Sequence, residues 1–184
     1  MAPMFVPGPV DVAPEVLAAQ AKPMMPHRSK DFEAIFRRTE EKLEKVFYTQ
    51  YRVFQATSSG SGMQEAGIRN FVQETVLSCT NGSFADRWYN VAISNGKQAD
   101  KLDVPWGQVI TPDMLADALK KKHYEAVTIV HNETSTGAVN PVKELAAVVQ
   151  DISPDTLVLV DAVSSLAGDK IEMDAWGIDF LLTS

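Results

Sequence analysis

The chain has 184 residues, of which 45% are hydrophobic, an ordinary proportion for a globular protein with one sizeable core. Its 17 Lys and Arg residues face 24 Asp and Glu residues, and the resulting net charge of −7 argues against nucleic acid or an anionic membrane as the main partner. Cys79 is the only cysteine, which excludes an intrachain disulfide and favours a reducing compartment. No apolar run reaches about 18 residues and no basic signal region opens the chain, so we expect a cytoplasmic protein without a membrane span. No metal site is predicted.

The first 28 residues contain six prolines, a density that excludes a long helix. They are expected to form an N-terminal arm, extended except for one short helix over 14–20. The apolar side chains of the arm cannot build a core alone, so we expect them to pack across the domain or onto a second subunit. These side chains are Phe5, Val6, Met24 and Met25.

Residues 29–184 alternate between helical and strand patterns, which predicts an α/β domain. Ser29 is the expected N-cap of the first helix, whose apolar face holds Phe32, Ile35, Phe36, Leu43, Val46 and Phe47. Helices are predicted over about 30–47, 63–76, 112–120 and 142–152, with another around Phe84 to Val91. Strands are predicted over 51–56, 76–79, 99–104, 126–131, 156–160 and 178–183.

The strand over 156–160 is β-branched or leucine throughout and ends in Asp161. Such an unalternating run suits a strand that is buried on both faces of a parallel sheet. Ligands bind at the carboxyl ends of strands in open α/β sheets, so Asp161 is placed for chemistry or for ligand orientation. Taken alone, a strand-end aspartate more often caps a turn.

Two further segments follow predicted strands. Ser58-Ser-Gly-Ser-Gly62 is a candidate phosphate cradle, because small residues at a helix N-terminus let backbone N–H groups approach an anion. It is neither a Walker loop nor a dinucleotide fingerprint, and taken alone a Ser/Gly segment of this kind is more often only a turn. His131-Asn-Glu-Thr-Ser-Thr-Gly137 crowds six polar residues onto another strand end, of which structural capping would explain one or two.

Phe84 and Trp88 lie one helical turn apart after the Asn81-Gly82 turn signal. Residues at this spacing most simply pack together into a core. The alternative interpretation is that Phe84 covers the face of a flat cofactor.

This combination of strand ends resembles the fold-type-I pyridoxal-phosphate enzymes, and more closely the class V aminotransferases of the serine–pyruvate and alanine–glyoxylate type. The resemblance extends through nearly the whole chain. It is carried by Pro7-Gly-Pro9, Pro26-His-Arg-Ser29, the Ser-Gly-Ser-Gly turn, Gly82-Ser-Phe-Ala-Asp-Arg-Trp88, the segment 131–137, Leu159-Val-Asp-Ala-Val-Ser-Ser-Leu166 and Trp176-Gly-Ile-Asp179.

The resemblance implies the large domain of that fold, a mostly parallel mixed sheet with helices on both faces, and pyridoxal 5′-phosphate as cofactor. It implies that the phosphate is held by Ser61, Gly62 and Met63, that Phe84 stacks on the pyridine ring and Val163 packs under its other face, that Thr134 reaches the phenolic oxygen, and that Asp161 pairs with the ring nitrogen. A carboxylate beside that nitrogen keeps it protonated and makes the ring a better electron sink. Asp161, Phe84 and Thr134 would form the catalytic set.

The family's Schiff-base lysine is missing from this sequence. By the family pattern it would lie about three residues beyond Ser184, in the Schiff-base role that a lysine performs. The family's small domain, with its arginine for the substrate carboxylate, is also missing. We therefore expect 29–184 to be an incomplete cofactor-binding domain, completed by a C-terminal segment or a second chain, in a homodimer.

The resemblance implies transfer of an amino group from a small amino acid, serine or alanine, to a small 2-oxo acid, glyoxylate or pyruvate. One alternative is the lyase and desulfurase branch of the superfamily, although those enzymes usually place a histidine where Phe84 stands. Another is a non-catalytic fragment that lacks the lysine.

Overall fold

A five-stranded sheet organises the chain in the computed structural model, which describes residue 4 and residues 6–184. Every neighbouring pair of its strands runs parallel. In spatial order the strands are β2 (Gln98–Asp103), β1 (Thr75–Thr80), β3 (Ala126–Val130), β6 (Leu157–Asp161) and β7 (Phe180–Leu182). The predicted α/β architecture is confirmed.

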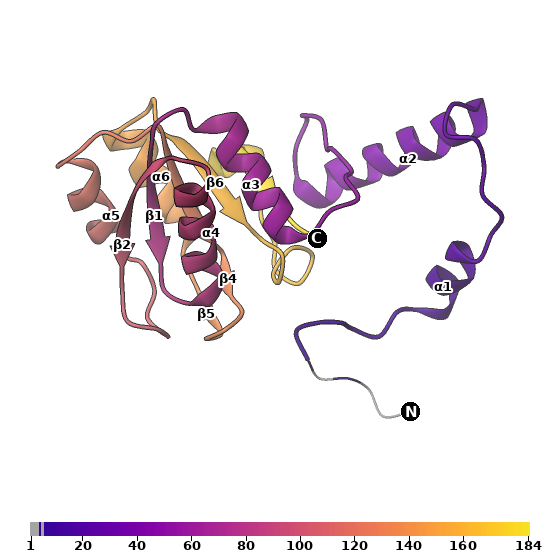
Figure 1. Ribbon diagram of the computed structural model, residues 1–184, viewed down its shortest axis with the longest axis horizontal. Helices are drawn as coiled ribbons and strands as arrows, with labels where there is room; N and C mark the ends of the chain where they lie inside the picture. The colour runs from indigo at the N-terminus through magenta and orange to yellow at the C-terminus, as the bar shows by residue number, and fades with distance from the viewer. Residues whose placement is uncertain (1–3, 5) are drawn as a thin grey trace.

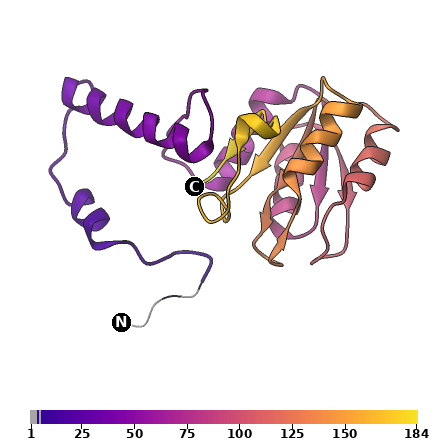
Figure 2. The same ribbon diagram turned by 180° about the vertical axis from the view of Figure 1, so that it is seen from behind.

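Helices cover both faces of this sheet (Figures 1 and 2). Successive residues of a strand point to opposite faces, so Val76 packs into the cluster under α3 (Gly60–Phe71) and α4 (Ser83–Ser94), while Leu77 packs into the cluster on the other face. That second cluster lies under α5 (Pro112–Leu119), α6 (Val142–Ile152) and α7 (Met173–Trp176). This two-sided burial explains why the central strands lack a polar face.

The polar segment after β3 folds into a short antiparallel hairpin. Its strands are β4 (Asn132–Glu133) and β5 (Ala138–Val139). The hairpin returns the chain to α6 and holds the side chains of 132–136 at the carboxyl edge of the sheet.

The N-terminal part projects away from the sheet (Figures 1 and 2). It contains the predicted short helix α1 (Pro14–Gln20) and the predicted α2 (Lys30–Phe47), whose first turn is capped by the Ser29 hydroxyl. Residues 4 and 6–28 are exposed, and Phe47 is the one buried residue of α2. The apolar face of α2 is therefore largely uncovered in a single chain. Phe5 of the predicted arm lies outside the described residues.

Two predicted elements differ from the structure. The expected strand over 51–56 does not form, because this segment connects α2 to α3 away from the sheet and has no strand beside it; Phe54 is 75% exposed. The helix expected over 63–76 begins earlier, at Gly60, because Ser59 caps it, and ends at Phe71, since Thr75 and Val76 enter β1. Over the described ranges, no helix is both long enough and apolar enough to cross a membrane.

Candidate functional site

The candidate site lies at the edge of the sheet where the carboxyl ends of β3, β6 and β7 meet. Asp161 is the last residue of β6 and pairs with Val130 on one side and Leu182 on the other. It is 5% exposed. Its Oδ1 accepts the Val163 backbone N–H at 2.9 Å, and its Oδ2 accepts the Gln64 side-chain amide at 2.7 Å. The carboxylate is thus held by two donors at the end of a buried strand.

Burial raises the pKa of Asp161 above its ordinary value, because a charged carboxylate loses its hydration there. The N–H groups of Val163 and Gln64 lower the pKa, since they stabilise the anion. Two charged neighbours add opposite effects: Glu133 raises the pKa and Arg87 lowers it. An additional cationic partner would favour the charged form of this carboxylate.

The N-terminus of α3 supplies free backbone donors beside this carboxylate. Ser59 is the N-cap, and its Oγ accepts the Gly62 N–H at 3.4 Å. The Met63 N–H donates to the Ser59 carbonyl at 3.0 Å, so it is already used within the helix. The expected role of Met63 in holding a phosphate stays a prediction, although its N–H is occupied in this conformation. The first N–H groups of a helix have no partner within it, and none is recorded among the described residues for Gly60 or Ser61.

The turn at Gly60 lies against the other strand ends. A Cβ at this position would come within 2.9 Å of Val163 Cγ2 and within 3.6 Å of Ser184 Oγ. Glycine is therefore required by this close approach of α3, the loop after β6 and the end of β7. Figure 1 shows the C-terminal end of the chain beside the start of α3.

The two aromatic residues of α4 have different environments. Trp88 is 1% exposed and its indole N–H donates to the Gln64 carbonyl at 3.1 Å, so it is a core residue that joins α4 to α3. Phe84 is only partly buried, and the Arg87 guanidinium lies over its ring at 4.9 Å from the centroid. Arg87 also donates to the Ser61 hydroxyl at 3.2 Å. Trp88 is therefore a core residue, as one of the two interpretations predicted. The partly buried ring of Phe84 lies beside the N-terminus of α3, through Arg87.

Thr134 is tied to the loop that follows β6. Its hydroxyl donates to Ser164 Oγ at 2.7 Å, and the Ser164 hydroxyl donates to the Asn132 carbonyl at 3.0 Å. Ser164 directly follows Val163, so these bonds join the hairpin to the segment beside Asp161. The predicted residues Ser61, Thr134, Asp161 and Val163 are brought to one edge of the sheet.

Two other residues of the polar run have structural partners. Glu133 is fully buried and its carboxylate accepts backbone N–H groups at the start of α4. His131 Nδ1 lies 2.9 Å from Ser165 Oγ, and Nε2 lies 3.8 Å from an Asp169 oxygen. Burial lowers the pKa of His131, and Asp169 partly opposes that shift.

Sequence reasoning missed Gln64 and Arg87 as neighbours of the predicted site. The sequence offered two signals for these neighbours: a glutamine one helical turn beyond the candidate cradle, and an arginine one turn beyond Phe84. Gln64 and Asp161 are far apart in the chain, so their contact could not be predicted without the fold.

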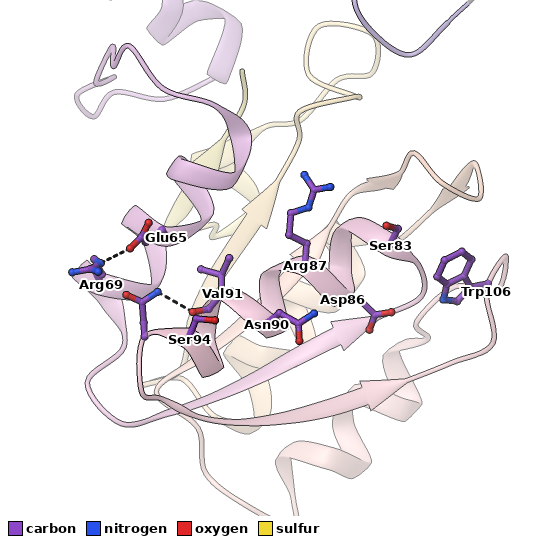
Figure 3. A pocket seen from close by; sticks show the side chains of 10 residues that line it. Glu65, Arg69, Ser83, Asp86, Arg87, Asn90, Val91, Ser94 and Trp106 are labelled. Atoms are coloured by element: carbon purple, nitrogen blue, oxygen red, sulfur yellow. Dashed lines mark hydrogen bonds and ion pairs between the residues drawn. The ribbon is translucent and has the colours of Figure 1, made fainter.

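A surface hollow of about 560 Å³ is lined by residues of α3 and α4 and by Trp106, and it shares Arg87 with the strand-end cluster. Figure 3 shows its lining, with Asp86, Asn90 and Trp106 around it and a bond between Glu65 and Arg69. Arg87 extends from α4 away from Asp86 and Asn90 in this view. The hollow is open to solvent and has both polar and apolar lining, whereas the buried carboxylate and the free amides lie at the sheet edge.

Comparisons with known proteins agree with this geometry. The family model described as "Aminotransferase class-V" matches residues 14–184. An uncharacterized aminotransferase of Methanocaldococcus jannaschii is 42% identical over 183 residues, covering 98% of this chain and 47% of its own length. An L-aspartate–glyoxylate aminotransferase of Paracoccus denitrificans is 31% identical, covering 98% of this chain and 47% of its own length.

A solved structure gives the same result. The alanine–glyoxylate aminotransferase of Nostoc sp. superposes with a TM-score of 0.92 at 31% identity, covering 97% of this chain and 48% of its own. The chain thus spans about half the length of the curated relatives it matches. Pyridoxal 5′-phosphate is the cofactor of this family, and its large domain has the fold described above. The chain belongs to the class-V aminotransferase family.

Proposed function

We propose that the protein, together with the residues that complete it, is a pyridoxal-phosphate-dependent aminotransferase. It transfers an amino group from a small amino acid, serine or alanine, to a small 2-oxo acid, glyoxylate or pyruvate. The observation that carries this proposal is the Asp161 carboxylate, buried at the end of β6, oriented by two N–H donors and adjacent to free helix amides.

The residues at the sheet edge fit the cofactor. The unpaired N–H groups of Gly60 and Ser61, the Ser61 hydroxyl and the Arg87 guanidinium would hold its phosphate, with Gly62 beside them. Phe84 would stack on its ring, Val163 would pack under the other face, and Thr134 would bond its phenolic oxygen. The glycine at position 60 lets the N-terminus of α3 lie against Val163, because a Cβ there would meet that side chain.

The cofactor, when bound, supplies an electron sink next to the α-carbon of the amino acid. Asp161 holds a proton at the ring nitrogen, because an ionised carboxylate in a dry site strongly favours a cationic neighbour. Thr134, whose hydroxyl is bonded to that of Ser164, would orient the edge of the ring. Burial of Asp161 excludes water, which would otherwise weaken its interaction.

The substrate class is supported by the names of the relatives. Both the Paracoccus and the Nostoc proteins are named for glyoxylate, while their amino donors differ between aspartate and alanine. A small 2-oxo acid is therefore the better supported half of the proposal.

The proposal includes a lysine beyond Ser184, supplied by a C-terminal segment or chain, and a homodimer. The exposed apolar face of α2 and the exposed arm support dimerisation, since both have apolar side chains without a partner in a single chain. The buried, reduced Cys79 is compatible with a cytoplasmic location.

The test is to express the whole protein and to add pyridoxal phosphate. We expect an absorbance band in the visible range and transfer of the amino group of alanine or serine to glyoxylate. Aspartate as donor and 2-oxoglutarate as acceptor are the comparison substrates. A protein that binds the cofactor but transfers no amino group from any of these donors would contradict the proposal.

A further inference from the structure

Gln64 is fixed between three elements of the core. It lies on α3, and its side chain is 1% exposed. Its backbone carbonyl accepts the Trp88 indole N–H at 3.1 Å from α4, and its side-chain amide nitrogen lies 2.7 Å from Asp161 Oδ2 at the end of β6. A glutamine side chain that is buried and bonded at its amide nitrogen loses the freedom it would have on a surface.

The other end of the same amide has no partner. Gln64 Oε1 is buried without a hydrogen bond from any described residue. Buried polar atoms are nearly always paired, and an unpaired one costs free energy. An apolar side chain would avoid this cost. The bond of the amide nitrogen to Asp161 must therefore give a benefit that offsets it.

We propose that Gln64 is a positioning residue that holds Asp161 in its ionised form and in a fixed orientation. The inference rests on the proposed function for its consequence in catalysis, but the contact itself does not. The amide nitrogen faces the carboxylate because the reverse orientation would set two oxygens against each other. A donor on the charged carboxylate favours the anion.

The surroundings of Asp161 make this donor important. Burial disfavours the anion, and so does the negative charge of Glu133 from β4. Arg87 from α4 favours the anion, and the Val163 N–H bonds the other carboxylate oxygen. His131, which directly follows β3, has its ring directed to Ser165 and Asp169. Gln64 is therefore one of two N–H donors that oppose the effect of burial on the pKa of Asp161.

The unpaired oxygen also acquires a use. If Asp161 takes up a proton, its new O–H needs an acceptor, and a half-turn of the Gln64 amide would present Oε1 to it. Glutamine can thus pair with both charge states of the carboxyl group, but its bond to the anion is the stronger one, because that bond is charge-assisted. Leucine would pair with neither, and glutamate would pair only when the two acids share a proton.

The direct test is a titration of the Asp161 carboxyl carbon by NMR in the whole, cofactor-free protein. We expect Gln64→Leu to raise the pKa of Asp161 by about one unit, a tenfold change in proton affinity, or ~1.4 kcal/mol. Gln64→Met, which keeps an unbranched side chain, serves as a second variant and should give the same shift. Gln98→Leu is the matched control, because the Gln98 amide also donates to a carboxylate, that of Glu74, but on the surface.

A pKa of Asp161 that stays at the wild-type value in both folded Gln64 variants would overturn the inference. So would a shift of equal size in Gln98→Leu.

The second readout is the pH dependence of turnover. With Gln64→Leu, we expect kcat at neutral pH to fall, by up to about tenfold, and to recover as the pH rises, because more Asp161 becomes ionised. A purely structural role would lower kcat at all pH values alike, and that result would count against the inference. If the NMR shift occurs but the wild-type protein transfers no amino group, the proposed function fails while the Gln64 contact stands.

Discussion

The carboxylate of Glu133 caps the helix that carries Phe84: Oε2 accepts the Phe84 backbone N–H at 3.1 Å. The same oxygen accepts the Ala85 N–H at 3.0 Å, and Oε1 accepts the Ser135 hydroxyl at 2.6 Å. Gly82, the N-cap of α4, has no side chain to perform this task, and a Cβ there would overlap the Glu133 side chain. The acid of the polar run therefore has a structural role, since every recorded contact of its carboxylate is with a donor.

Replacement of this acid should destabilise the domain. Glu133→Gln puts an NH₂ group against N–H donors, and loss of hydrogen bonds to a charged group costs about 2 kcal/mol or more. Chemical denaturation monitored by circular dichroism would measure the change. The control is Glu65→Gln on α3, an exposed partner of Arg69, for which we expect a change within about 0.5 kcal/mol. Equal stability of the two variants would refute the capping role.

Asp161→Asn should separate stability from activity. The pKa of Asp161 is raised above the ordinary value of 3.8, so the native state binds its proton more tightly than the unfolded chain does. Stability from this group is therefore highest at low pH and is lost as the pH rises through the raised pKa. The uncharged amide avoids that loss, and rotation of Gln64 would let its unpaired oxygen accept the new N–H.

We accordingly expect the cofactor-free Asp161→Asn protein to be at least as stable as wild type at pH 7, with a flatter pH profile in thermal melts. In the whole enzyme, transamination should slow by about 100-fold or more, because the amide cannot hold the ring nitrogen protonated. Near wild-type turnover would show that Asp161 does not face the ring.

Arg87→Gln should weaken cofactor binding. The guanidinium bonds Ser61 beside the free N–H groups of α3, and it has no ion pair among the described residues, so its charge is open to a phosphate. We expect the affinity for pyridoxal phosphate, measured by fluorescence quenching, to fall about tenfold or more, with a smaller loss in Arg87→Lys. Affinity for unphosphorylated pyridoxal should change little. Arg69→Gln, in the last turn of α3, is the control; an equal loss there would indicate a general charge effect.

The stability of the fold should fall as the pH drops below the ordinary histidine range. Burial lowers the pKa of His131 from 6.5, so the unfolded chain binds this proton more tightly than the native state does. The contribution of this group is therefore complete above about pH 6.5 and is lost as the pH falls toward the lowered pKa. His131→Gln should flatten the slope of unfolding free energy in that window, and an unchanged slope would exclude His131 as its source.

Deletion of residues 1–28 from the whole protein should weaken the proposed homodimer. The described part of this arm is exposed, with Met24 98% and Val10 58% accessible in a single chain. Burial of apolar surface at roughly 25 cal/mol per Å² is the available source of order for such a segment. Analytical ultracentrifugation should show a larger monomer fraction after deletion, and an unchanged dimer constant would place the interface elsewhere.

Local sequence signals specified most of the elements. The cap at Ser29, the helical spacing of apolar residues and the unbroken apolar runs predicted α2, α5, α6 and the central strands to within a few residues. These signals act over three or four residues, so they need no knowledge of the fold. Asp161 was identified in the same way, because a strand end is a local feature.

Tertiary structure decided the remaining features, since they depend on pairs of residues far apart in the chain. The segment 51–56 has strand-like composition but no strand beside it, and a strand forms only where its backbone groups can pair. Ser59 starts α3 three residues before the expected position, which commits the Met63 N–H to the helix. The contact of Gln64 with Asp161 and the cap that Glu133 forms on Phe84 exist only because parallel strands bring their carboxyl ends to one edge.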